Sequence, residues 1–280
     1  MKRFLLTLLT VALVAALAVF VVAPAAVRQR RLWENGKAVA GYLDCVNGLG
    51  APDCEAMLAQ AQEHNRALDS APWADPYAPE AGPADEGGSY AALLNPAGNG
   101  VMAVLDMPKL GVSLPVYHGG ESAIPGRVEQ APRSWLPSGD TEGPCVLRAG
   151  RERFFDPFAD LDRLMVGDCF FLRVLQETAT YEVFQVATLS PGALAGLEGI
   201  EDGDECALVA QTAAGDRLVV RGRRVPRQSV KPTDDSRPLP GGVPELIFAA
   251  PIAAAGLALL AIVEVFRRAV QRHRRRRTKL

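Results

Sequence analysis

Two long apolar runs bracket a mainly polar middle section in this chain of 280 residues. The first, Phe4 to Val27, carries no charge and consists mostly of Leu, Val and Ala, and the second, Leu246 to Val263, has the same character. A helix needs about 20 apolar residues to cross a bilayer. The pattern predicts two flanking transmembrane helices. The first run could also be a signal-anchor or a cleaved signal peptide, because Ala23-Pro-Ala25 suits signal peptidase.

Between these runs the pattern changes from helical to β. Residues 28–70 are dominated by Ala, Leu, Gln and Glu, which favours helices. From Val101 to Val225, short β-branched runs alternate with Gly, Pro and Asp, which is typical of an all-β barrel or sandwich. The predicted segments are a transmembrane helix or signal-anchor at 1–27, a helical extension at 28–70, a lid-like loop and linker at 71–100, a β domain at 101–228, a Pro/Gly linker at 229–242, a transmembrane helix at 243–266 and a basic tail at 267–280.

The basic residues predict the orientation in the membrane. Seven Arg and one Lys follow the second apolar run, so the C-terminal tail is predicted to be cytoplasmic and to contact membrane lipids, and the middle section to face outward. The formal net charge is only −2. Without the basic flanks of the two runs, however, 17 basic and 30 acidic residues remain, near −13. Such an acidic outward section excludes nucleic acid as an expected partner.

The cysteines indicate an oxidising compartment and not a metal site. There are five cysteines without a CxxC pair, and only three histidines, so neither a metal nor another cofactor is predicted. Cys45 and Cys54 flank a turn-forming run between two helical stretches, and a disulfide across that hairpin is expected. Cys169 is left over and is interpreted as an unpaired buried thiol.

Several motifs of the outward section resemble the class C sortases, the pilin-polymerising group. Their order and approximate spacing agree with that family, and the resemblance implies an eight-stranded sortase-type β-barrel, two membrane helices, and sorting-signal peptides of pilins or surface proteins as partners. The motifs are the strand pair within residues 95–120, Trp135-Leu-Pro-Ser-Gly139, the strand entry within residues 160–170, and the stretch Asp204 to Arg224.

The same resemblance implies a catalytic site in which two of the three functional residues are substituted. A sortase needs a Cys thiolate as nucleophile, a His for proton transfer and an Arg for the developing oxyanion. The family's Cys position falls on Gln211, and its His position falls on Gly150, whereas the Arg position is retained as Arg217. A carboxamide is neither a useful nucleophile nor titratable near neutral pH. Arg217 has an alternative interpretation as a solvated charge beside Asp216, at a tight hairpin.

A lid is implied by Asp75-Pro76-Tyr77, because class C sortases carry an Asp-Pro-aromatic segment over the active site, usually with Trp or Phe. Tyr77 is a mild departure from that pattern, and an Asp-Pro turn is also common by itself.

The other cysteines and histidines do not replace the missing groups. Cys206 precedes Gln211 by five residues, an odd offset that places the two side chains on opposite faces of a strand. If the two key strands are parallel neighbours, as in sortases, Cys145 and Cys206 lie level and are candidates for a disulfide. His118 and His64 are interpreted as surface or packing residues.

Three functions follow as hypotheses. The leading one is a membrane-anchored, extracytoplasmic, catalytically degenerate sortase-like protein that binds sorting-signal peptides or a partner sortase in pilus or surface-protein assembly. The second is an active cysteine transpeptidase of LPxTG-type signals with an unrecognised nucleophile. The third is a structural membrane protein without a peptide partner.

Overall fold

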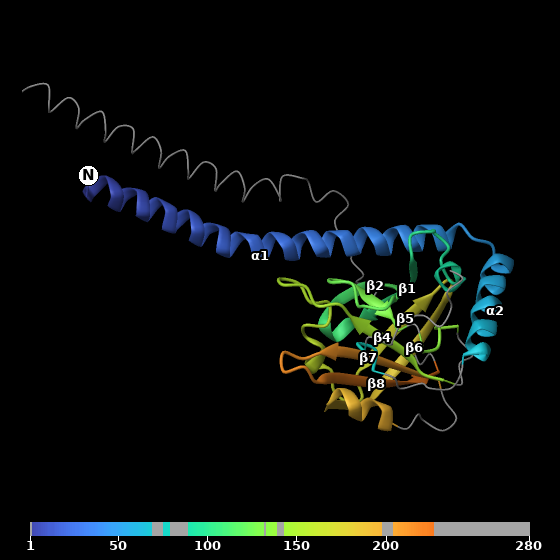
Figure 1. The fold of residues 1–280 in the computed structure, drawn as a ribbon. Helices are drawn as coiled ribbons and strands as arrows, with labels where there is room; N and C mark the ends of the chain where they lie inside the picture. The colour runs from blue at the N-terminus through green and yellow to red at the C-terminus, as the bar shows by residue number, and fades with distance from the viewer. Residues whose placement is uncertain are drawn as a thin grey trace, which may run out of the picture. The chain divides into compact units, whose positions relative to one another are not determined.

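The structure is a computed structural model that describes residues 2–68, 75–78, 89–131, 133–138, 143–197 and 204–226, with side chains from Ala23 onward except at 195 and 196. Its fold is mainly β, a closed barrel with a helical N-terminal region, which confirms the predicted barrel and helices (Figure 1). The strands are β1 Val101–Met107, β2 Val112–His118, β3 Val128–Gln130, β4 Cys145–Ala149, β5 Cys169–Val174, β6 Glu177–Leu189, β7 Glu205–Gln211 and β8 Arg217–Val225.

The strands close in the order β1-β2-β3-β4-β7-β8-β6-β5. Two neighbouring pairs are parallel, β2 with β3 and β4 with β7, and the other pairs are antiparallel. Strands β4 and β7 are buried along nearly their whole length. A strand buried on both faces has apolar residues at successive positions instead of alternating ones. This explains the continuous runs Cys145-Val-Leu and Cys206-Ala-Leu-Val.

Two helices precede the barrel, α1 at Lys2–Asn47 and α2 at Ala51–Ala67, with the turn-forming run between them. The described section from Arg31 onward packs on the barrel through buried polar contacts. The Tyr42 hydroxyl donates to the carbonyl of Met102 over 2.9 Å and accepts from the amide of Leu175 over 2.7 Å. In α2, the Asn65 amide exchanges hydrogen bonds with the backbone of Leu136. These contacts fix both helices against the strands.

Short 3-10 turns complete the fold. They are η1 Tyr90–Ala92, η2 Pro108–Leu110, η3 Leu161–Arg163 and η4 Pro191–Gly196.

No helix within the described residues has the length and apolar character of a membrane span. The second predicted transmembrane helix, 243–266, lies outside the described residues, as do the linker at 229–242 and the basic tail at 267–280.

Candidate functional site

The predicted catalytic positions meet where the parallel strands β4 and β7 end. The register pairs Cys145 with Cys206 and continues to Arg148 with Val209. Gly150 and Gln211 each lie two residues beyond that last pair. On the other side of β7, Gln211 pairs directly with Arg217 of β8. The structure therefore brings the three positions to one place on the barrel.

Alternation along these strands assigns the site to the outer face of the barrel. Cys145, Leu147, Cys206 and Leu208 belong to the main core. The intervening side chains form a second apolar cluster with residues of the β6–β7 connection. The members of this outer cluster are Ala131, Val146, Leu194, Ala207, Val209 and Val219, with Tyr77, Leu189 and Leu197 packed against it.

Gly150 is crowded by backbone. It forms a bridge with Pro125, and its carbonyl accepts from the Gly126 amide over 2.7 Å, while its amide donates to the Arg127 carbonyl over 2.8 Å. A Cβ atom at this position would lie 1.8 Å from the carbonyl oxygen of Ile124. No side chain fits there unless segment 124–127 moves. The place that the resemblance assigns to an imidazole is filled by the main chain.

Gln211 is the exposed last residue of β7. The hairpin that follows is tight, because the Thr212 amide donates to the Asp216 carbonyl over 2.9 Å and Gly215 adopts a φ of 95°. A positive φ of this kind favours glycine. The hairpin sets Arg217 opposite Gln211, but the amide offers no ionisable group to the site.

Arg217 is buried and holds the predicted lid. Its Nε and Nη2 donate to the two carboxylate oxygens of Asp75, each over 2.9 Å, and Nη1 donates to the Gly215 carbonyl over 2.6 Å. The side chains are only 7% and 13% exposed for Arg217 and Asp75. Arg217 is thus not a solvated charge beside Asp216. The bidentate pair leaves little of the guanidinium available to an incoming oxyanion.

Tyr77 inserts between the ends of β4 and β7. Its ring centroid lies 4.8 Å from the Arg217 guanidinium carbon. Its hydroxyl lies 3.0 Å from the Ala149 carbonyl oxygen and 2.8 Å from that of Val209, and accepts from the Ala149 amide over 3.2 Å. Burial raises the pKa of Tyr77 well above its usual range, so the phenol stays neutral and can donate. The predicted lid residues therefore cover the site.

A buried ion pair beneath the lid was missed at the sequence level. Arg148 and Glu129 are both fully buried, and their Nη2 and Oε2 atoms are 3.0 Å apart. Arg148 also donates to the Gly120 carbonyl over 2.7 Å and to the Pro76 carbonyl of the lid. Burial raises the pKa of Glu129, against the lowering effect of Arg148 and of the Ile124 amide. The available signal was Arg148, a charged residue inside the otherwise apolar strand β4, which demands a partner.

The predicted disulfides are wrong, because all five cysteines are free thiols. The Cys45 thiol donates to the Pro96 carbonyl over 3.2 Å instead of bonding to Cys54. Cys145 and Cys206 do lie level on parallel strands, but they are joined by a hydrogen bond between thiols. Level Cα positions allow a disulfide without requiring one.

The free thiols do not resemble activated nucleophiles. Burial raises the pKa of Cys54, of Cys169 and, most strongly, of Cys206. An activated cysteine needs a lowered pKa and solvent access.

Both histidines that were interpreted as surface or packing residues have packing contacts. The ring nitrogens of His118 lie 3.1 Å and 2.7 Å from the carbonyl oxygens of Gly100 and Leu93. The His118 ring meets Tyr90 edge-on, and the His64 ring lies 5.9 Å from the Tyr90 ring. Within the described ranges, no group of His, Cys, Asp or Glu side chains is arranged to hold a metal ion.

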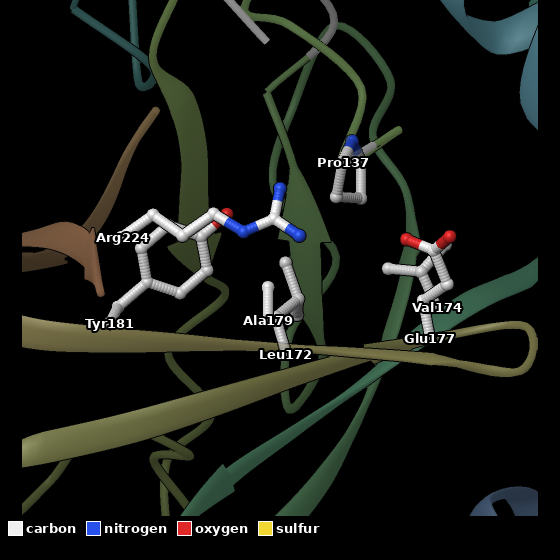
Figure 2. A pocket seen from close by; sticks show the side chains of 7 residues that line it. All are labelled: Pro137, Leu172, Val174, Glu177, Ala179, Tyr181 and Arg224. Carbon is white, nitrogen blue, oxygen red and sulfur yellow. The ribbon is translucent and has the colours of Figure 1, made fainter. Parts of the chain in front are cut away.

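A small hollow lies on another part of the barrel. Its cavity volume of about 10 Å³ suits roughly one water molecule, so it cannot hold a peptide. Figure 2 shows the Arg224 guanidinium extending across it between Tyr181 and Pro137. The remaining lining residues are Leu172, Val174, Glu177 and Ala179.

Comparison with solved structures reveals close matches to this architecture. Sortase C1 from Streptococcus agalactiae is 27% identical and has a TM-score of 0.57, with 69% of this chain and 100% of that chain covered. Sortase C-1 from Streptococcus pneumoniae is 26% identical and has a TM-score of 0.60, with 69% of this chain and 100% of that chain covered. Sortase C-1 from Actinomyces oris is 28% identical and has a TM-score of 0.52, with 62% of this chain and 99% of that chain covered.

No family model and no curated protein matches the chain. The likeness of structure nevertheless extends over essentially the whole length of these sortases, and it agrees with the order of the sequence motifs. The chain is similar in structure to the class C sortases and shares their eight-stranded barrel, which supports the resemblance to the sortase family.

Proposed function

We propose that this protein is a non-catalytic, membrane-anchored class C sortase relative that binds sorting-signal peptides of pilins or surface proteins, or a partner sortase, during pilus or surface-protein assembly. The observation that carries this proposal is the crowding at Gly150, where backbone of segment 124–127 fills the position assigned to an imidazole. Without an imidazole there, the site lacks the general base that sortase chemistry uses.

The other half of the catalytic pair supports the same conclusion. Gln211 stands opposite Arg217, where the resemblance assigns the thiolate. The arginine that would serve an oxyanion is instead bound to Asp75 through two hydrogen bonds. A site with an amide, a bare backbone position and an engaged guanidinium suits recognition better than acyl transfer.

A binding role is supported by the features that remain. The barrel, the Asp75-Pro76-Tyr77 lid and the outer apolar cluster are all present. The class C sortases from streptococci and Actinomyces share the barrel. Because the chain's own Tyr77 and Leu194 cover the outer face of β4 and β7, a peptide must displace the lid to reach these strands.

Membrane anchoring is part of the proposal and rests on the sequence. The apolar runs Phe4 to Val27 and Leu246 to Val263 each have the length of a bilayer span. The basic tail after the second run supports a cytoplasmic C-terminus and a barrel outside the cytoplasm.

An active transpeptidase with another nucleophile is the competing function. It requires a cysteine near Arg217 with a lowered pKa. The pKa shifts of Cys54, Cys169 and Cys206 are all upward, and Cys206 points to the opposite face from Gln211.

Binding of a fluorescent LPxTG-type peptide to the full chain in detergent tests the proposal, with a scrambled peptide as control. We expect selective binding that tightens in Asp75→Asn, because this change loosens the lid. If the peptide does not bind, a partner sortase should co-purify with the chain. Absence of both interactions would overturn the proposed function.

A further inference from the structure

Two loops beside the degenerate site form an exposed surface with mixed apolar and basic character. Segments 124–127 and 150–155 are joined by the bridge between Pro125 and Gly150. Ile124 is 44% exposed and Phe154 is 38% exposed, and they are two of only four exposed large hydrophobic residues in the described part of the chain. Exposed apolar side chains on neighbouring segments can contribute to an interaction surface.

Three arginines lie among these apolar side chains. The Arg127 guanidinium lies 4.4 Å from the centre of the Tyr117 ring, and that of Arg153 lies 5.3 Å from the Phe154 ring. Arg151 is 52% exposed, and its Nε is 3.5 Å from the Asp156 carboxylate. A guanidinium that is stacked on a ring keeps its edge donors for an anion.

Two of the nearby carboxylates are paired with arginines. Both Glu152 oxygens accept from Arg31, over 2.7 Å and 3.2 Å. Asp156 faces Arg151. For Arg127 and Arg153, the contacts seen in the described structure are with rings and not with carboxylates. This surface therefore offers positive charge, although the outward section as a whole is near −13.

The same surface is tied to the chain close to the first apolar run. Arg31, which binds Glu152, comes four residues after Val27. Four residues of chain reach at most about 14 Å, however they are arranged. If the run lies in a bilayer, the Arg31 backbone lies within that reach of the run, and the Arg31 to Glu152 pair links Arg31 to the loops.

We propose that the arginine patch, defined as Ile124, Arg127, Arg151, Arg153 and Phe154, docks on anionic phospholipid headgroups of the membrane that anchors the chain. The arginines bind the headgroup phosphates, and the two apolar side chains enter the interface, as in other peripheral membrane contacts. Docking fixes the orientation of the barrel, and of its lid, relative to the membrane. This inference rests on the anchoring in the proposed function.

Hydrogen exchange of the full chain in lipid nanodiscs tests the patch. We expect peptides covering 121–127 and 150–156 to exchange more slowly in discs of phosphatidylglycerol than in discs of phosphatidylcholine. The pair of substitutions Arg127→Gln and Arg153→Gln should remove this difference, because it lowers occupancy of the anionic surface about 30-fold. The matched control is Met165→Ser with Val166→Ser, which changes the other two exposed hydrophobic residues and should leave the difference intact.

Equal exchange in both kinds of disc would overturn the proposal. Slower exchange with soluble glycerol phosphate alone would also overturn it, since that result indicates an anion site and not a lipid surface. Slower exchange with an added pilin protein but not with lipid would overturn it as well. If the chain does not enter discs, the anchoring fails. The same exchange measurement with added anionic vesicles then decides the patch separately: protection that the arginine substitutions abolish supports it, and no protection refutes it.

Discussion

Replacing Gly150 by alanine tests the crowding that excludes an imidazole from the site. The new Cβ would lie 1.8 Å from the Ile124 carbonyl oxygen and 2.4 Å from its carbon. Both atoms belong to backbone, so they cannot turn away as a flexible side chain would. Segment 124–127 would have to separate from the end of β4.

The cost follows from the contacts that would be lost. The Gly126 to Gly150 and Gly150 to Arg127 hydrogen bonds, at 2.7 Å and 2.8 Å, would weaken or break. Each contributes about 0.5–1.5 kcal/mol net. Overpacking adds about 1–3 kcal/mol. The free energy of unfolding should therefore fall by about 2–6 kcal/mol, a large part of the roughly 5–15 kcal/mol typical of a domain.

Urea unfolding followed by circular dichroism measures this change. The matched control is Gly192→Ala, because a Cβ at Gly192 meets nothing within 4 Å. This control should change the free energy of unfolding by less than about 0.5 kcal/mol. Equal stabilities for the two alanine variants would refute the crowding. For the same steric reason, Gly150→His combined with Gln211→Cys should not create activity.

Three further predictions concern the lid, a histidine and the thiols. Asp75→Asn and Arg217→Gln should each speed hydrogen exchange at 75–78, and the double variant should add little, because either change breaks the same pair; fully additive effects would contradict this. Burial lowers the pKa of His118 below its usual 6.5, so as the pH falls this side chain is protonated first in the unfolded chain. The free energy of unfolding should therefore decrease from pH 6.5 down to the lowered pKa, and His118→Gln should flatten that decrease. An unchanged slope in the variant would show that His118 is accessible in the folded protein. Iodoacetamide at pH 8 should leave Cys145 and Cys206 unmodified until the chain unfolds, and rapid modification of either in the folded protein would show that they are accessible.

Local patterns and motif order predicted the architecture well. Short β-branched runs indicated an all-β barrel or sandwich. The family resemblance indicated the barrel and the parallel register that sets Cys145 level with Cys206. The Asp75-Pro76-Tyr77 segment, which carries a recognisable turn signal, does contact Arg217. These features depend on residues close together in sequence or on strand geometry.

The features that were missed depend on long-range packing. Glu129 and Arg148 lie on different strands, and the lid carbonyl that Arg148 binds comes from residue 76. The crowding at Gly150 arises from segment 124–127, and no local pattern reveals it. The disulfide prediction failed for a related reason: spacing showed which thiols could approach, but the direction of the Cys45 thiol toward Pro96 is set by tertiary contacts.

Cleavage of an LPxTG-type peptide by the purified full chain tests the central claim most directly, with mass spectrometry to detect a covalent peptide adduct. We predict no cleavage and no thioester on any of the five cysteines, with or without an amine acceptor. Turnover that Gln211→Ala abolishes, or an acyl group trapped on a cysteine beside Arg217, would contradict it.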